Sequence, residues 1–186
     1  MLLGVFGTKA QEFSGLKLLT DSTNVASFYK MRNNASFIEF FLKGKKQFGD
    51  HAYYQEVRTY SWGSSDTNYY REDDEYYYHF DPDNGLESIV LPKHPLVGQM
   101  WLEADSSWSY EILAIDRTLK VPRKKYKNLV LVECKQLTGR DKSKYDIYHL
   151  YYGEGQGFVA SMSKASLSSY LEKRVFRAKE GDVIGD

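Results

Sequence analysis

The chain has 186 residues, of which 42% are hydrophobic and 16% aromatic, a length and apolar content that fit one folded domain and exclude a disordered chain. Lysine and arginine together number 25, as do aspartate and glutamate, so no net charge favours nucleic acid or an anionic membrane surface as a partner. The sequence contains no apolar run of about 18 residues, and we therefore expect no membrane-spanning helix.

The N-terminus resembles part of an export signal. Residues 1–7 are apolar, and Thr8-Lys9-Ala10 has the small-x-small character of a signal-peptidase site. The apolar stretch is short for a signal peptide, and no basic segment precedes it. Two interpretations are open: residues 1–10 are a truncated signal peptide, or they are an ordinary strand or lead. The first predicts a periplasmic or secreted protein of the bacterial envelope.

Strand signals dominate after residue 25, because β-branched and aromatic residues cluster in short runs separated by Gly, Asn, Asp and Pro. The runs predicted to be extended are 36–42, 52–61, 67–71, 75–80, 85–91, 107–120, 128–137, 145–152, 157–162 and 166–176. Their hairpin-scale spacing predicts neighbouring antiparallel strands.

The strand pattern predicts a single β-rich domain over residues 11–176. About ten strands with almost no helix indicate a mainly β fold, a large curled antiparallel sheet that forms a half-open or closed barrel with at most one or two short helices. A β-sandwich is the main alternative. Residues 15–30 fit a short helix and a strand equally well. The polar residues 177–186 are predicted to be a frayed C-terminal tail.

Tyrosines concentrate in the runs 67–71 and 75–80, which we predict to be the two arms of a hairpin. Because neighbouring strand residues point to opposite faces, aromatic rings occupy both faces of this part of the sheet. They either stabilise the sheet as cross-strand pairs or form an open surface for a ligand. Under the second interpretation, the candidate ligand-binding residues are Trp62, Tyr70, Tyr76, Tyr78, Trp101 and Trp108.

Few residues suggest catalysis or metal binding. Residues 81–85 combine Asp-Pro and Asn-Gly pairs, which predict a turn; their spaced carboxylates also suggest a calcium loop, but its remaining ligands are missing. The single cysteine, Cys134, lies in an apolar run and is predicted to be a buried, unreactive thiol. The histidines show no ligand or triad spacing. We therefore predict no catalytic residues, no metal and no cofactor.

Three motifs along residues 91–159 are similar to those of a known group of proteins. They are Leu91-Pro92-x-x-Pro95-Leu96-Val97-Gly98-Gln99-x-Trp101, Val121-Pro122-Arg123-Lys124-Lys125-Tyr126-Lys127-Asn128 and Tyr151-Tyr152-Gly153-Glu154-Gly155-Gln156-Gly157-Phe158-Val159. Over residues 75–162 the chain resembles uncharacterised bacterial secreted or envelope β-proteins, lipoproteins among them, whose half-barrel domain is similar to that of periplasmic lipoprotein carriers. The chain departs from the group at Lys124, where the group has glycine, and at Tyr126, where it has phenylalanine.

This resemblance implies export and the binding of an apolar or amphipathic ligand or of a protein partner, and it implies no catalytic residues. We therefore expect a non-catalytic envelope protein, periplasmic or secreted, that binds a lipid-like ligand or an envelope protein on a concave aromatic face. The alternative is a carbohydrate-binding module whose exposed Tyr and Trp rings stack on a glycan. The sequence leaves the oligomeric state open.

Overall fold

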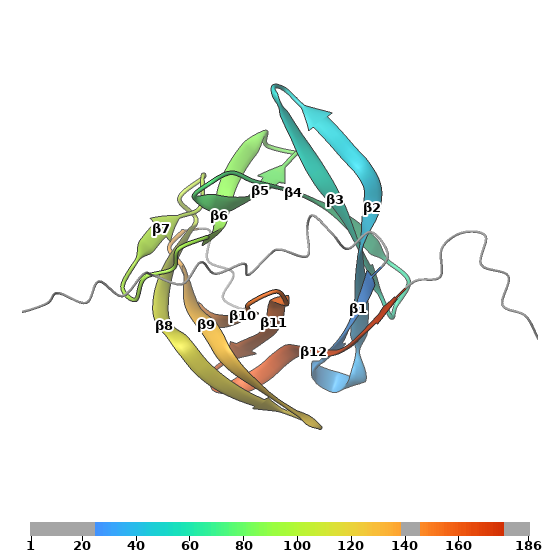
Figure 1. Ribbon diagram of the computed structural model, residues 1–186, viewed down its shortest axis with the longest axis vertical. Coiled ribbons are helices and arrows are strands. Elements are labelled where there is room, and N and C mark those ends of the chain that lie inside the picture. Colours follow the sequence, from blue (N-terminus) through green and yellow to red (C-terminus); the bar gives the residue numbers. More distant parts are fainter. Residues whose placement is uncertain (1–24, 139–145, 177–186) are drawn as a thin grey trace, which may run out of the picture.

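The computed structural model describes residues 25–138 and 146–176 and folds them into one curled antiparallel sheet (Figure 1). The truncated signal peptide predicted at residues 1–10 and the tail predicted at 177–186 lie outside the described residues, as does the part of 15–30 that precedes Val25. The strands of the described residues are β1 (Val25–Met31), β2 (Ser36–Phe48), β3 (His51–Tyr60), β4 (Ser65–Glu72), β5 (Tyr76–Asp81), β6 (Leu86–Pro92), β7 (Met100–Leu102), β8 (Trp108–Val121), β9 (Lys124–Gln136), β10 (Ile147–Gly153), β11 (Gly157–Ser163) and β12 (Ser166–Phe176). The helical content of these residues is one 3-10 turn, η1 (Arg32–Asn34).

The sheet is a meander whose first and last strands pair with each other. Its order is β6-β5-β4-β3-β2-β1-β12-β11-β10-β9-β8-β7, so every pair of neighbours is also consecutive in sequence except β1 and β12. This long-range pairing curls the sheet nearly into a ring, with β6 and β7 as its two edges (Figure 1). The predicted mainly β, barrel-like sheet is thereby confirmed. The sandwich alternative is wrong, because the described strands all belong to one sheet.

The seam between β6 and β7 is bridged by side chains instead of a ladder of backbone hydrogen bonds. The indole Nε1 of Trp101 donates to the carbonyl oxygen of Ile89 at 3.0 Å. Beyond the end of β7, the backbone N of Ala104 donates to Oγ of Ser88 at 3.1 Å. β7 has only 3 residues, which gives it little backbone with which to extend a ladder. The barrel therefore has one lateral junction that is weaker than the others.

Two clusters of buried hydrophobic side chains hold the sheet in its curled shape. One cluster contains Tyr29, Phe37, Leu119, Val121, Tyr126, Leu129, Leu131, Tyr151, Val159, Ala160 and Leu171. The other contains Tyr77, Leu91, Ile112, Val130, Val132, Cys134 and Tyr152. The predicted burial of Cys134 is confirmed, and this burial raises the pKa of its thiol well above the ordinary value, so the thiol stays protonated.

Two predicted strand boundaries are wrong, each for a local backbone reason. The run 36–42 is predicted to end at residue 42, but β2 continues to Phe48 because Gly44, at φ 80°, forms a bulge where the β2–β3 register shifts. β9 begins at Lys124, ahead of the predicted start at residue 128. There Arg123, at φ 71°, completes a tight turn directly after Pro122, so the strand resumes at once.

The turn predicted at residues 81–85 is confirmed. The side chain of Asp81 accepts hydrogen bonds from the backbone N of Asp83 at 3.0 Å and from Nδ2 of Asn84 at 2.7 Å. The backbone N of Gly85, at φ 71°, donates to the Asp81 carbonyl oxygen. Both carboxylate oxygens of Asp81 are therefore engaged in holding the turn.

Candidate ligand-binding site inside the barrel

A cavity of about 460 Å³ lies inside the curled sheet. Its wall is built by side chains from β1, β2, β3, β4, β6, β10, β11 and β12, so both halves of the sheet enclose it. Aromatic rings make up much of this wall: Tyr29, Phe37, Phe40, Phe41, Tyr60, Tyr70, Tyr148, Tyr152 and Phe158. The same wall carries four charged side chains, Glu39, Glu56, Arg58 and Arg174.

Register across four neighbouring strands places a polar row on this wall, which consists of Arg174, Ser27, Glu39 and Arg58. Ser27 of β1 is paired with Arg174 of β12 on one side and with Glu39 of β2 on the other. Glu39 is paired in turn with Arg58 of β3. Because directly paired residues of antiparallel strands point to the same face, the four side chains all face the cavity.

Hydrogen bonds fix the polar row in place. Nε of Arg58 donates to Oε1 of Glu39 at 2.8 Å, and Nη2 of Arg58 lies 2.6 Å from the same oxygen. At the other end of the row, Nε of Arg174 donates to Oγ of Ser27 at 3.1 Å, and its Nη2 donates to the carbonyl oxygen of Gln156. Burial raises the pKa of Glu39, and the positive charge of Arg58 opposes that rise.

Glu56 lies beside the polar row, on the same face of β3 as Arg58, and is only 8% exposed. Its Oε2 accepts a hydrogen bond from Nδ2 of Asn68 at 3.2 Å and lies 3.9 Å from Nη2 of Arg58. Two buried carboxyl groups therefore share one guanidinium. Burial, and after it the negative charge of Glu39, raises the pKa of Glu56 to about 8, so Glu56 is mostly protonated at neutral pH.

Aromatic rings surround these charged groups. Tyr29 stacks on Phe37 with ring centroids 4.5 Å apart, and its hydroxyl donates to the carbonyl oxygen of Phe158 at 3.0 Å. Burial raises the pKa of Tyr29, Tyr70 and Tyr152, so their hydroxyls are neutral at physiological pH. The cavity thus offers aromatic faces, neutral hydroxyls and buried charges to whatever occupies it.

Of the six residues predicted to bind a ligand, Tyr70 lines the cavity itself. Two others contact cavity-lining rings. Trp62 is 59% exposed and stacks on Tyr60, with ring centroids 4.5 Å apart, and Trp108 packs on Tyr148 at 6.0 Å. A fourth, Trp101, stacks on Tyr110 with ring centroids 5.4 Å apart and bridges the seam.

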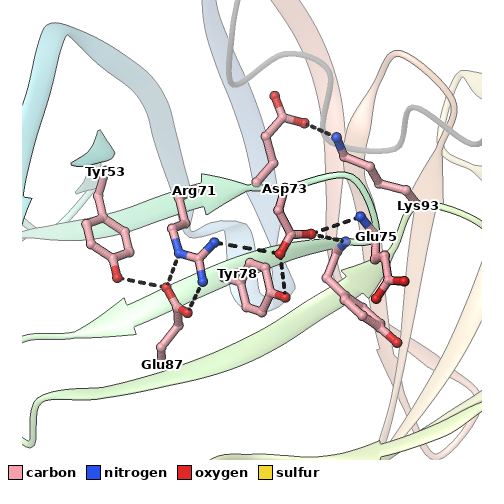
Figure 2. Close-up of polar contacts among 9 residues, drawn as sticks. Tyr53, Arg71, Asp73, Glu75, Tyr78, Glu87 and Lys93 are labelled. Carbon is pink, nitrogen blue, oxygen red and sulfur yellow. Dashed lines mark hydrogen bonds and ion pairs between the residues drawn. The ribbon is translucent and has the colours of Figure 1, made fainter. Parts of the chain in front are cut away.

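The remaining two, Tyr76 and Tyr78, lie on the outer face of the sheet. Tyr78 is paired with Arg71, which follows the cavity-lining Tyr70 on β4, and successive strand residues point to opposite faces. The hydroxyl of Tyr78 donates to Oδ2 of Asp73 at 2.8 Å, and the Arg71 guanidinium lies over the Tyr78 ring, 4.0 Å from its centroid (Figure 2). The structure therefore does not bring the six candidates together in one site.

Arg71 is the centre of this outer network (Figure 2). It forms an ion pair with Glu87, with Nε of Arg71 donating to Oε1 at 2.6 Å. The hydroxyl of Tyr53 donates to the same carboxylate oxygen at 2.7 Å. The network ties β3, β4 and β6 together. Burial, and after it the hydrogen bond to Asp73, raises the pKa of Tyr78 to about 12.

Sequence reasoning missed the charged residues of the cavity. A local signal for them exists, because in β3 the alternate residues Tyr54, Glu56, Arg58 and Tyr60 share one face. A carboxylate and a guanidinium between two aromatic residues on one strand face are unusual for a purely solvated surface. In β2 Glu39 likewise alternates with Phe37 and Phe41. Such a pattern indicates charges placed within an aromatic interior.

Among residues 25–138 and 146–176, no group of three histidine, cysteine or carboxylate side chains is placed to hold a metal ion. The same part of the chain contains no helix with the length and apolarity needed to cross a lipid bilayer. The chain matches no known family model, no curated protein and no solved structure.

Proposed function

We propose that this protein is a non-catalytic binding protein that holds an amphipathic small molecule inside its barrel. The observation that carries the proposal is the cavity of about 460 Å³, whose largely aromatic wall is interrupted by one polar row. Ligand sites for small molecules are commonly cavities of about 300–1,000 Å³ with apolar walls and a few polar groups that fix orientation. An apolar body would lie against the rings and a polar end against the charged side chains.

The proposal is supported by the way the polar groups are held. Glu39 and Arg58 bind each other, and Arg174 is tied to Ser27 and to a backbone carbonyl, so the row is rigid before any ligand arrives. A rigid polar anchor lowers the entropy cost of binding. Preorganised charges next to stacked rings suit recognition of a molecule with one polar and one apolar end.

Native mass spectrometry of the purified chain with a panel of single-chain amphiphiles tests this function. We expect one ligand per chain, and we expect Ser161→Phe, which projects a ring into the cavity, to abolish the bound species. Thr67→Phe places the same ring at an exposed position and serves as the matched control. Retention of no amphiphile by the wild type, or equal retention by both variants, would contradict the proposal.

A rival function, glycan binding, is favoured by one observation. Trp62 is 59% exposed and is backed by Tyr60 with an interplanar angle of 18°, which leaves one flat ring face toward solvent. The rings of Tyr76 and Tyr78, by contrast, are inclined at 62° and offer no coplanar platform. Glycan-array binding that is lost in Trp62→Ala but kept in Ser161→Phe would support the rival and count against the barrel interior.

We also propose a periplasmic or secreted location, supported by the apolar residues 1–7 and the small-x-small segment that follows them. Fractionation of the native host should place the protein outside the cytoplasmic membrane. Recovery in the cytoplasmic fraction would contradict this location and leave the binding function untouched.

A further inference from the structure

The contact geometry around Arg58 gives Glu56 longer polar contacts than Glu39 has. Nη2 of Arg58 lies 2.6 Å from Glu39 but 3.9 Å from Glu56, so Glu39 has the closer ion pair of the two. The hydrogen bond from Asn68 to Glu56 is long, at 3.2 Å, and reaches only Oε2. A further hydrogen-bond donor would stabilise a carboxyl group that is buried with such long contacts.

The second guanidinium of the cavity does not supply this donor. Arg174 donates to Ser27 and to the Gln156 carbonyl oxygen, both neutral acceptors. It lies on β12, three strand spacings from Glu56 on β3, or about 14 Å along the sheet. The positive charge of Arg174 acts on Glu39, whose pKa it lowers, whereas Arg58 is the cation that acts on Glu56.

The surroundings of Glu56 favour a positively charged donor. Its neighbours are Glu39 from β2, Asn68 and Tyr70 from β4, Tyr29 from β1, Tyr152 from β10, and Arg58 on its own strand. The faces of aromatic rings attract cations, most strongly where water is excluded. Arg58 is the one cation among these groups.

We propose that the cavity takes an amphipathic ligand whose polar end is a protonated amine, bound to the Glu56 carboxylate beside Glu39, with its apolar body against the aromatic wall. This inference rests on the proposed binding function and specifies the class of ligand. The ammonium donates its hydrogen bonds to Glu56, and the rings of Tyr29, Tyr70 and Tyr152 surround it.

Binding is coupled to release of a proton. At neutral pH the free protein holds a proton on Glu56, because its pKa is raised to about 8 by burial and by Glu39. The ammonium ion enters with its own charge, the Glu56 proton leaves to solvent, and the carboxylate then pairs with the ammonium. No bond to carbon is made or broken, and the charge of the site is unchanged.

Calorimetric titration of the full chain at neutral pH with octylamine, octanol and octanoate tests the inference. We expect octylamine to bind about tenfold or more tightly than octanol, the order of one charge-assisted hydrogen bond. Its apparent binding enthalpy should vary with the ionisation enthalpy of the buffer, since a proton is released. Octanol binding should show no such dependence.

Glu56→Gln should remove both the preference for octylamine over octanol and the dependence of the octylamine binding enthalpy on the buffer. Glu133→Gln, on an outward-facing position of β9, is the matched control and should behave as wild type. Equal or tighter binding of octanoate, or octylamine binding without proton release, would overturn the inference and leave the binding function standing. Binding of none of the three ligands would contradict both.

Discussion

Trp101 and Ile89 join the two edge strands of the barrel, because the indole Nε1 of Trp101 donates to the Ile89 carbonyl oxygen at 3.0 Å across the seam. β6 and β7 are consecutive in sequence, yet this pair of neighbouring strands lacks a ladder of its own. Strands that follow each other in sequence usually pair through backbone hydrogen bonds, but the β6–β7 junction is closed by the Trp101 side chain.

Trp101→Phe should open this seam. The variant keeps an aromatic ring to stack on Tyr110 but loses the hydrogen bond to Ile89, so we expect the free energy of unfolding to fall by about 1–2 kcal/mol. Hydrogen exchange should increase in β6 and β7 more than in β2 and β3. Unchanged exchange at the two edge strands would show that the seam does not depend on Trp101.

Arg58→Met should destabilise the fold strongly at neutral pH. It removes the guanidinium that contacts Glu39 and Glu56, and removing one partner of a buried ion pair costs about 3–5 kcal/mol. The loss should shrink in acid, where Glu39 takes up a proton as well as Glu56. Urea denaturation at neutral and acidic pH measures both effects, and a loss independent of pH would argue that packing alone is responsible.

Glu56 should make the protein less stable as pH rises. Its folded-state pKa, about 8, lies above its ordinary value of 4.5, so between these values the folded state binds more protons than the unfolded state. Stability from this group is full below the lower value and is lost as pH rises toward the upper one, by up to about 1.4 kcal/mol for each pH unit.

Glu56→Gln isolates that contribution, because glutamine does not titrate. Denaturation of the wild type and the variant at a series of pH values, from mildly acidic to mildly basic, gives the free energy of unfolding of each as a function of pH. In this range the two profiles should have the same slope only above the folded-state pKa of Glu56. Parallel stability profiles over the whole range would mean that Glu56 is ionised in the folded protein at neutral pH.

The outer tyrosines should matter for stability and not for the cavity. Arg71→Met removes the ion pair with Glu87 and the cation above Tyr78, and we expect about 1–2 kcal/mol of destabilisation with unchanged octylamine affinity. Tyr78→Phe, which loses only the hydrogen bond to Asp73, should also bind as wild type. A large drop in affinity in either variant would place the ligand on the outer face.

Much of the strand pattern could be predicted from the sequence, because turn chemistry is local. Asp81 and Gly85 specify their turn through hydrogen bonds within a few residues. Gly44 shows the limit of this reasoning, since the same residue type that ends a strand can also form a bulge within one. Only the register with β3 distinguishes the two outcomes.

The candidate site could not be predicted, because it depends on pairings between distant segments. Ser27 and Arg174 are separated by 147 residues and meet only through the β1–β12 pairing. The ligand-binding candidates were instead chosen among the tyrosines and tryptophans, and of these six residues Tyr70 is the one that lines the cavity. The aromatic content of the sequence indicated that rings could bind a ligand. The charged side chains of the cavity come together only when β1 pairs with β12 and the sheet curls.

The most direct test of the binding function is a crystal structure of the protein grown with octylamine. The ligand should occupy the barrel cavity, with its nitrogen within hydrogen-bond distance of the Glu56 carboxylate and its chain against Phe37 and Tyr152. A cavity filled only by water or by neighbouring side chains, with octylamine absent or bound on the outer face, would contradict the claim that the barrel interior is the binding site.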